Sequence, residues 1–396
     1  MVVRVMIRKA VFLVLTACLV TGALLVGMPI SMAQAVNREE PERAGLVPTS
    51  VTAEAALLME YETGRVLYEK NGEQKRPMAS TTKIMTALLA LEEGDLDDEV
   101  TVSPYAASKP GSTMKLKAGD VFSLEELLWG LLLFSGNDAS VAIAEHIAGS
   151  EEAFVARMNR RAEEIGAVNT RFRNPHGLSA PGHYSTAYDL ALVTRYALRR
   201  PLFSLFVSTK RREVTGENRD QLKLELRNTN RLLWKYEPAD GVKTGTTVTA
   251  GECLVASATR GKMRLIAVVL RSQDRWADAQ RLLEYGFDRY QVLNFGQKGQ
   301  VYRTVPVSRG VKGKVPVVFE EDLYAVTTKD RATGLKAVDD LPAVLEAPLK
   351  EGEPVGGRYI YLDGELQAYV RLVSAEDVAR RGFLGSVLEV LRYLLW

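Results

Sequence analysis

The sequence has little cysteine, little histidine and almost no net charge. Its 396 residues include 2 cysteines and 3 histidines, and the formal net charge at pH 7 is +2. The two cysteines, Cys18 and Cys253, are too few to form the framework of a disulfide-stapled scaffold. The small net charge gives no basis for nucleic-acid binding. The length allows two domains with a stable core, and 46% hydrophobic with 25% charged residues is typical of a folded globular protein.

The few histidines do not form a pattern that supports histidine-dependent or metal-dependent hydrolysis. No Gly-x-Ser-x-Gly elbow is present, which disfavours a Ser-His-Asp hydrolase. His176 and His183 are candidate zinc ligands, but no His-Glu-x-x-His or other ligand set accompanies them. We therefore expect no metal and no cofactor. We interpret His146 as structural and His183 as a residue that positions a loop.

The first 35 residues are typical of an export signal. Three basic residues and no acidic one accompany an almost wholly apolar run over residues 11–30, and Ala33-Gln34-Ala35 then provides a small-x-small cleavage pattern. We predict a signal peptide over residues 1–35. A retained membrane anchor and a lipoprotein cleavage box ending at Cys18 are the alternatives. In each case the rest of the chain is exported.

A polar linker over residues 36–50 is followed by alternating strand and helix patterns. Helices that flank a mainly antiparallel sheet are the expected architecture, so the predicted fold class is α+β for a first domain over residues 36–293. The expected strands are 55–60, 65–68, 210–215, 223–226, 252–258 and 264–270, and the expected helices are 80–94, 124–134, 139–147, 151–165, 185–198 and 276–287.

After the first domain the pattern changes to short β-branched or alternating segments separated by Gly, Pro and Asp turns. These segments predict a small all-β domain over residues 294–375, and they contain no cluster of chemically active residues. The expected strands are 301–307, 314–319, 324–328, 357–362 and 365–372.

The last segment, residues 376–396, has the pattern of an amphipathic helix. Apolar side chains recur from Val378 to Trp396, while Arg380 and Arg392 lie mostly on the opposite face. The segment is too short and too charged to span a bilayer, but it suits a helix that lies in the membrane interface. We predict a peripheral membrane anchor. A helix docked on the β domain or on a partner is the alternative.

A serine and a lysine stand three residues apart where a helix is expected to begin. Pro77 precedes Ser80-x-x-Lys83, and apolar residues follow at helical spacing. Residues i and i+3 share a helix face, so both side chains can point into one space. A lysine desolvated by apolar neighbours loses its proton more easily and can activate a serine nucleophile. The alternative is a helix-capping serine beside a solvated lysine.

Two further short motifs follow Ser80-x-x-Lys83 along the chain. Ser135-Gly136-Asn137 ends the predicted helix 124–134, and Lys243-Thr244-Gly245 precedes a predicted strand pair. Each motif alone is weak, because the first also fits a helix cap and the second also fits the start of a strand. With Ser80-x-x-Lys83 they match the S-x-x-K, S-x-N and K-T-G set of penicillin-interacting serine enzymes.

The likeness extends beyond these motifs. Leu67-Tyr68-Glu69-Lys70-Asn71, Asn174-Pro175-His176-Gly177-Leu178 and Asp240-Gly241-Val242 before the lysine motif resemble the low-molecular-weight penicillin-binding proteins that act as D-alanyl-D-alanine carboxypeptidases. The resemblance covers essentially the whole exported chain, including the β domain and the terminal amphipathic helix. It implies a β-lactamase/transpeptidase-like catalytic domain that removes the terminal D-alanine of peptidoglycan stem pentapeptides and is inhibited by β-lactams.

The resemblance also implies roles for the motif residues. Ser80 attacks the carbonyl of the penultimate D-alanine to form an acyl-enzyme, and Lys83 takes the serine proton. Burial and the nearby cation of Lys243 are expected to keep Lys83 neutral. Ser135 relays a proton to the departing D-alanine. Asn137 donates to or accepts from the substrate amide.

The third motif is expected to hold the substrate. Lys243 and Thr244 offer a cation and a hydroxyl to the terminal carboxylate, and Gly245 lets the substrate backbone approach the strand. The backbone N–H groups of Ser80 and Thr246 are expected to form the oxyanion hole. Some relatives carry histidine after K-T-G, and threonine at position 246 replaces the side chain but keeps the backbone donor.

A β-lactamase, a transpeptidase and a non-catalytic scaffold are the alternatives to the carboxypeptidase. A β-lactamase needs a group that activates water for rapid deacylation, yet residues 166–190 contain no glutamate, and Glu163 and Glu164 fall on a predicted helix. Transpeptidation shares the first half-reaction, and a non-catalytic, peptidoglycan-binding envelope scaffold is the alternative outside enzymes.

Overall fold

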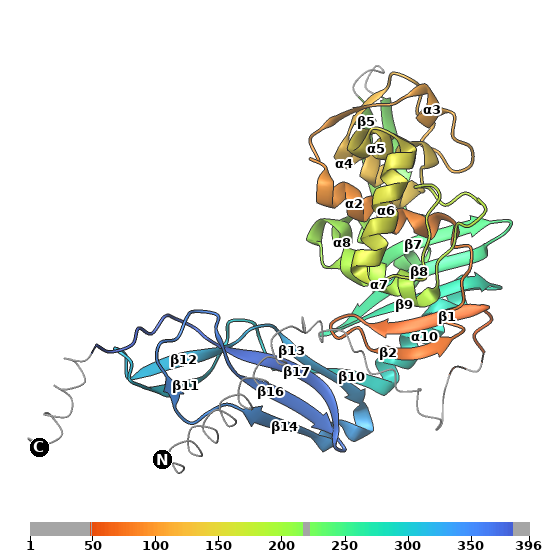
Figure 1. Ribbon diagram of the computed structural model, residues 1–396. Helices are drawn as coiled ribbons and strands as arrows, with labels where there is room; N and C mark the ends of the chain where they lie inside the picture. Colours follow the sequence, from red (N-terminus) through yellow and green to blue (C-terminus); the bar gives the residue numbers. More distant parts are fainter. Residues whose placement is uncertain (1–47, 49, 217–221, 383–396) are drawn as a thin grey trace, which may run out of the picture. The chain divides into compact units, whose positions relative to one another are not determined.

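The computed structural model describes residue 48, residues 50–216 and residues 222–382 (Figure 1). The expected signal segment over residues 1–35 therefore lies outside the described residues. Within them, an antiparallel sheet organises the first domain, in the strand order β2-β1-β9-β8-β7. Its strands are β1 (Ala55–Glu60), β2 (Val66–Lys70), β7 (Ala239–Thr247), β8 (Gly251–Arg260) and β9 (Met263–Ser272).

Both faces of this sheet are buried, which explains why β1 is apolar along nearly its whole length. Leu57 packs into the cluster on one face, and Leu58 packs into the cluster on the other, because successive strand residues alternate. One face is covered by α10 (Arg275–Arg289). Gly286 of α10 allows this close contact, since a Cβ there would lie 2.5 Å from Leu265 Cδ1.

The other face carries the remaining large helices, so the predicted α+β class with helices flanking an antiparallel sheet is confirmed. Each helix on this side buries apolar side chains in a single shared core. The helices are α2 (Lys83–Glu93), α4 (Leu124–Trp129), α5 (Asn137–Ala148), α6 (Glu151–Ile165), α7 (Ala187–Leu198) and α8 (Pro201–Ser208). Helices α2, α5, α6 and α7 begin and end close to the expected positions.

Several details differ from the sequence-based expectation. The expected helix over residues 124–134 is α4 followed by a wider π-helical turn, η2 (Gly130–Phe134). A Cβ at Gly130 would lie 1.9 Å from Met114 Sδ, so this turn packs directly on the neighbouring loop. Helix α8 was not expected, because an apolar run that begins at a proline has no clear period. The shorter elements are η1 (Ala79–Thr82), β3 (Glu99–Thr101), α3 (Pro104–Ala107), β4 (Val121–Ser123), β5 (Arg211–Gly216), β6 (Leu222–Arg227) and α9 (Leu232–Lys235).

The later part of the described chain is all-β apart from one short 3-10 turn, as expected. A six-stranded sheet has the order β14-β16-β17-β12-β11-β15, and β10 (Tyr290–Gly296) pairs with β13. The expected boundary at residue 294 falls inside β10, because the preceding helix ends directly at this strand. The other elements are β11 (Val301–Ser308), β12 (Lys314–Phe319), β13 (Leu323–Thr328), η3 (Lys329–Gly334), β14 (Leu335–Asp340), β15 (Leu345–Glu346), β16 (Pro354–Leu362) and β17 (Glu365–Ser374).

The start of the expected C-terminal helix needs correction. Residues 376–382 are not helical, because Val378 pairs with Leu349 and Arg380 pairs with Gly310 in extended bridges. The Val378 side chain is buried in the core of the β domain and is not part of a free apolar helix face. Residues 383–396, which hold the rest of the expected helix, lie outside the described residues.

Candidate active site

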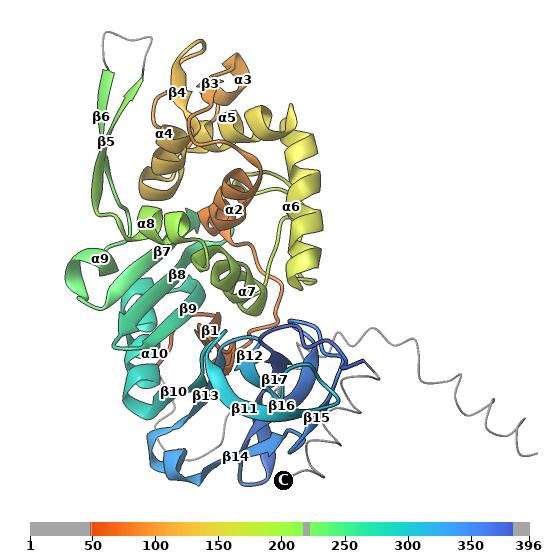
Figure 2. The same ribbon diagram turned by 90° about the vertical axis from the view of Figure 1, so that its left-hand side faces the viewer.

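The serine and lysine of the first motif lie at the junction of η1 and α2. Ser80 is within η1, and Lys83 is the first residue of α2. Helix α2 contacts α5, α6 and α7, which enclose it in the helical side of the domain (Figure 2). The i, i+3 spacing places Lys83 Nζ 3.1 Å from Ser80 Oγ. The two side chains therefore meet, as the spacing predicted.

The Lys83 amine is buried among oxygen acceptors. Its Nζ lies 2.7 Å from Asn137 Oδ1 and 2.6 Å from the His176 carbonyl oxygen. Burial lowers the pKa of Lys83 well below its ordinary value, and the positive charge of Lys243 lowers it further, whereas Asp138 acts in the opposite direction. The amine is thus held close to the serine hydroxyl with its neutral form favoured.

The third motif lies on β7, the edge strand beside η1. The Lys243 side chain is buried. Its burial, with a smaller contribution from the positive charge of Arg275, lowers the pKa of Lys243 to about 7. The Thr244 hydroxyl lies 2.8 Å from the Thr229 hydroxyl. A Cβ at Gly245 would lie 3.0 Å from Ser80 N, so only glycine leaves this approach between strand and η1 open.

Arg275, which was not predicted from the sequence, hydrogen-bonds the end of the third motif. Arg275 Nη1 donates to the Gly245 carbonyl at 2.9 Å and to the Thr246 hydroxyl at 2.7 Å. Arg275 is the first residue of α10, and no motif marks it in the sequence. Its position next to Lys243 brings a second cation to the strand where an anionic substrate group is expected.

The second motif forms the turn between η2 and α5. Ser135 is buried and adopts a left-handed backbone with φ of 69°, which ends η2 and lets α5 begin at Asn137. The Asn137 side chain donates to the Pro110 carbonyl at 2.6 Å and accepts from Lys83. The adjacent Asp138 carboxylate accepts from Met114 N and Leu116 N, which fixes the facing loop.

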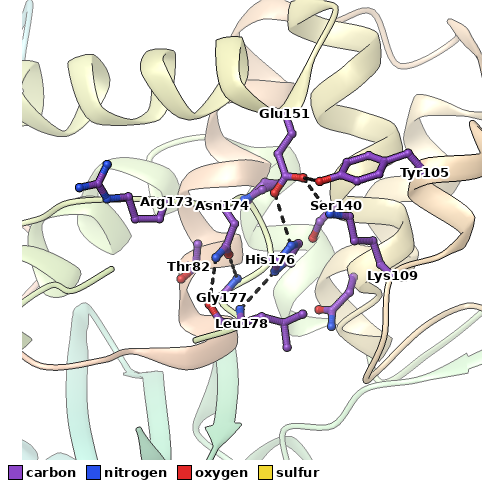
Figure 3. A network of polar contacts seen from close by, with 12 residues as sticks. Thr82, Tyr105, Lys109, Ser140, Glu151, Arg173, Asn174, His176, Gly177 and Leu178 are labelled. Carbon is purple, nitrogen blue, oxygen red and sulfur yellow. Dashed lines mark hydrogen bonds and ion pairs between the residues drawn. The ribbon is translucent and has the colours of Figure 1, made fainter. Parts of the chain in front are cut away.

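The loop over residues 174–178 contributes a backbone acceptor to the site. In the sequence this loop was marked only by the family resemblance. Asn174 turns the chain by accepting from Gly177 N at 2.6 Å and donating to the Leu178 carbonyl at 2.9 Å (Figure 3). Gly177 has φ of +90°, and a Cβ there would lie 2.0 Å from the Ala79 carbonyl oxygen. This turn presses the loop against η1 and directs the His176 carbonyl at Lys83.

His183 connects the same loop to η1. Its Nδ1 accepts from Arg173 N at 2.9 Å, so its Nε2–H faces the Thr82 hydroxyl at 2.9 Å. Burial lowers the pKa of His183 to about 4, with smaller contributions from His176 and Arg173. The expectation that His183 positions a loop near the site is confirmed by these contacts. His146 instead pairs with Asp98 on the surface.

The described residues contain no group of three or more His, Cys, Asp or Glu side chains placed to hold a metal ion. His176 and His183 face different partners, Glu151 and Thr82 respectively. Of the helices that the structure describes, none is both long and apolar enough to cross a membrane.

Comparison with known proteins identifies the two parts of the chain. Residues 39–274 match the D-alanyl-D-alanine carboxypeptidase family, and residues 290–380 match the penicillin-binding protein 5 C-terminal domain. D-alanyl-D-alanine carboxypeptidase DacF of Bacillus subtilis is 38% identical over 84% of this chain and 87% of its own length. DacC of Escherichia coli is 38% identical over 85% of this chain and 87% of its own length.

Solved structures agree with this assignment. Penicillin binding protein 5 from Haemophilus influenzae matches with a TM-score of 0.73 at 33% identity, over 85% of this chain and 100% of that chain. A cysteine-to-alanine mutant of the Streptomyces K15 DD-transpeptidase matches over 60% of this chain and 98% of that chain, with a TM-score of 0.57 at 34% identity. The family match, the relatives and the shared fold show that the chain belongs to the D-alanyl-D-alanine carboxypeptidase family, as a serine-type hydrolase of the cell wall.

Proposed function

We propose that Ser80 is the nucleophile and Lys83 the general base of this D-Ala-D-Ala carboxypeptidase. The observation that carries the proposal is the 3.1 Å separation of Lys83 Nζ from Ser80 Oγ at a buried lysine whose pKa is lowered by burial and by Lys243. A neutral amine at this distance can take the hydroxyl proton as the oxygen attacks. A cationic lysine has no lone pair for that step.

The reaction then proceeds through an acyl-enzyme. Ser80 Oγ forms a bond to the carbonyl carbon of the penultimate D-alanine, and its proton moves to Lys83 Nζ. The oxyanion accepts hydrogen bonds from the Ser80 and Thr246 backbone N–H groups, a role supported by the close packing of Gly245 on Ser80 N. Collapse breaks the amide bond, and Ser135 passes a proton to the nitrogen of the departing D-alanine. Water then hydrolyses the ester.

Substrate recognition is assigned to the other motif residues. The terminal carboxylate of the stem pentapeptide pairs with Lys243 and accepts from the Thr244 hydroxyl. Asn137 hydrogen-bonds the substrate amide, and Gly245 leaves room for the substrate backbone beside β7. The burial of Lys243 strengthens its attraction for a carboxylate, because few water molecules screen the pair. Nearby Arg275 adds positive charge on the same side.

β-Lactams are proposed as inhibitors of the same serine, because their strained amide acylates it without releasing a small leaving group. We expect slow deacylation. Glu163 and Glu164 lie near the end of α6, and the loop that faces Ser80 offers the His176 carbonyl in place of a carboxylate. A β-lactamase is therefore not favoured, and the match to the carboxypeptidase family disfavours a non-catalytic scaffold.

Labelling with a fluorescent penicillin tests these assignments. The wild-type protein is expected to form a covalent adduct and to release D-alanine from defined pentapeptides, and Ser80→Ala is expected to do neither. Ser308→Ala, in the β domain, serves as the matched control. Absence of labelling in the wild type, or equal labelling of Ser80→Ala, would contradict the proposal. Pentapeptides with lysine or diaminopimelate at the third position then identify the preferred stem.

We also propose how the chain is placed in the envelope. An exported peptidase domain acts at the outer face of the cytoplasmic membrane, in the periplasm or cell-wall space, and a C-terminal amphipathic helix holds it to the membrane surface. The proposed segments are a signal peptide over 1–35, the peptidase domain over 36–293, the β domain over 294–375 and the anchor over 376–396. The strand bounds favour moving the second boundary to residue 290 and the third beyond residue 382.

A further inference from the structure

Glu151 is a buried carboxylate that belongs to none of the three motifs and contacts the loop whose carbonyl accepts from Lys83. Glu151 begins α6, and its side chain is 10% exposed. Its Oε2 accepts from the Tyr105 hydroxyl at 2.7 Å and from Lys109 Nζ at 2.9 Å, and its Oε1 lies 3.5 Å from His176 Nε2 (Figure 3). One carboxylate therefore joins α3 and its following loop to the loop that carries His176.

The first connection runs through His176 to Lys83. His176 Nδ1 accepts from Leu178 N at 3.2 Å, so the ring proton is on Nε2 and faces Glu151. The ring is buried, and its backbone carbonyl accepts from Lys83 Nζ at 2.6 Å. Holding the imidazole against Glu151 therefore also fixes the direction of this carbonyl.

The second connection runs through Lys109 to Asn137. The Lys109 side chain is 12% exposed and lies over the Tyr105 ring, 3.7 Å from its centroid. Pro110, the next residue, accepts from Asn137 Nδ2 at 2.6 Å through its carbonyl. The opposite end of that amide, Oδ1, contacts Lys83 at 2.7 Å. The Lys109–Glu151 ion pair thus restrains the segment that orients Asn137.

These two acceptors matter because of the shape of a neutral amine. Neutral Lys83 has two N–H bonds and one lone pair, and the two hydrogens can be donated to the His176 carbonyl and to Asn137 Oδ1. The lone pair is then left for the remaining neighbour, Ser80 Oγ. A small displacement of either acceptor turns the lone pair away from the serine proton.

We propose that Glu151 is a positioning residue for acylation: through His176 and Lys109 it fixes the two oxygen acceptors that aim the lone pair of Lys83 at Ser80. This inference rests on the proposed roles of Ser80 and Lys83. Glu151 itself touches neither the substrate nor the serine. Burial of the carboxylate opposes its ionisation, but its bonds to His176, Lys109 and Tyr105 lower the pKa of Glu151 to about 2, so the network is charged throughout the working pH range.

Glu151→Gln tests the proposal with almost no change in shape. A glutamine amide has one oxygen, so it cannot accept from Lys109 and Tyr105 and also from His176 Nε2–H. We expect the rate of acylation by a fluorescent penicillin to fall about tenfold or more. For pentapeptide hydrolysis kcat should fall while KM stays within about twofold, since the carboxylate-binding residues are untouched. Glu152→Gln, an exposed neighbour in the same helical turn, removes the same charge and should behave like the wild type.

The pH profile separates positioning from a structural role. Charged or titratable groups that act on Lys83 come from β7 (Lys243), from α5 (Asp138) and from the 174–178 loop (His176). Oxygen acceptors favour the charged amine, so loosening them should lower the pKa of Lys83 and move the acid limb of the acylation profile to lower pH. A loss of thermal stability with an unchanged profile shape and rate would overturn the proposal.

Two further variants keep the test decisive if Glu151→Gln folds poorly. Lys109→Gln and Tyr105→Phe each remove one donor to Glu151 near the surface, and each should lower the acylation rate less than Glu151→Gln does. Equal rates and pH profiles for the wild type and these variants would refute the positioning role. Failure of the proposed function looks different, because the wild type itself would then not be acylated, or Ser80→Ala would be acylated equally.

Discussion

Lys83 and Lys243 are both buried at the same site, and the positive charge of Lys243 helps to lower the pKa of Lys83. Burial makes the larger contribution, and the second cation adds to it. The family resemblance and the burial expected for Lys83 had predicted this dependence between two residues on different elements, a helix start and an edge strand. The relationship makes Lys243 relevant to proton transfer as well as to substrate binding.

Replacing Lys243 should therefore change the pH profile. Lys243→Met removes a cation that disfavours protonated Lys83, so the pKa of Lys83 should rise and the acid limb of the acylation profile should move to higher pH. Stopped-flow acylation from pH 5 to 10 measures this shift. Lys262→Met, on the exposed β8–β9 turn, is the control. An unshifted limb in Lys243→Met would contradict the coupling.

The pKa of about 7 for Lys243 also predicts weaker substrate binding at alkaline pH. The amine is protonated below that value and neutral above it, so its attraction for the terminal carboxylate is lost as pH rises. For pentapeptide hydrolysis KM should rise above about pH 7, which lowers kcat/KM. Lys243→Arg stays charged and should show a flatter KM over this range. A wild-type KM that stays constant from pH 6 to 9 would contradict this role of the Lys243 charge.

Gly245→Ala should block acylation without unfolding the domain. The new methyl group would lie 2.9 Å from the Met78 carbonyl oxygen and 3.0 Å from Ser80 N, so it would displace the proposed oxyanion donor from the strand. Loss of one such donor costs about 10²- to 10³-fold in rate. Gly313→Ala, where no atom lies within 4 Å of the added group, is the matched control. Labelling of Gly245→Ala at the wild-type rate would argue against the donor role.

His183 should make the protein less stable in acid. Its pKa is lowered to about 4 in the folded state, against 6.5 for an unperturbed histidine, so the unfolded chain binds the extra proton first as pH falls. Stability is complete above about pH 6.5 and falls as pH decreases toward 4, by up to about 3 kcal/mol. Urea unfolding between pH 4 and 7 measures it. His183→Gln should flatten this slope, and an unchanged slope would exclude His183 as its source.

Truncation after Gly382 should release the protein from membranes while leaving the enzyme active. This end point keeps the paired segment over residues 376–382, including buried Val378, and removes only residues 383–396. An earlier cut at residue 375 would also remove part of the β-domain core. Flotation with vesicles and penicillin labelling of the released fraction give the two readouts. Unchanged membrane association would reject the proposed anchor.

Local patterns in the sequence were enough to predict much of the fold. Periodic apolar residues located α6 and α10 closely, because one stripe of a helix must face the core. The same reasoning merged α4 and η2 into one helix, since a π-helical turn packed through Gly130 onto Met114 leaves no periodic signal. It also extended the terminal helix over Val378, whose burial depends on a distant segment.

The chemical groups of the site could be read from the sequence: a serine and lysine at helical spacing, an asparagine turn and a lysine-threonine-glycine strand. These groups were selected by side-chain type and spacing together with the resemblance to penicillin-interacting serine enzymes. The burial of Lys83, the hydrogen bond from its Nζ to the His176 carbonyl and the contact of Glu151 with the His176 ring are visible only in the folded chain. Every residue has a carbonyl, so a backbone acceptor leaves no mark in a sequence. Desolvation and Coulomb interaction depend on distances that exist only after the chain has folded.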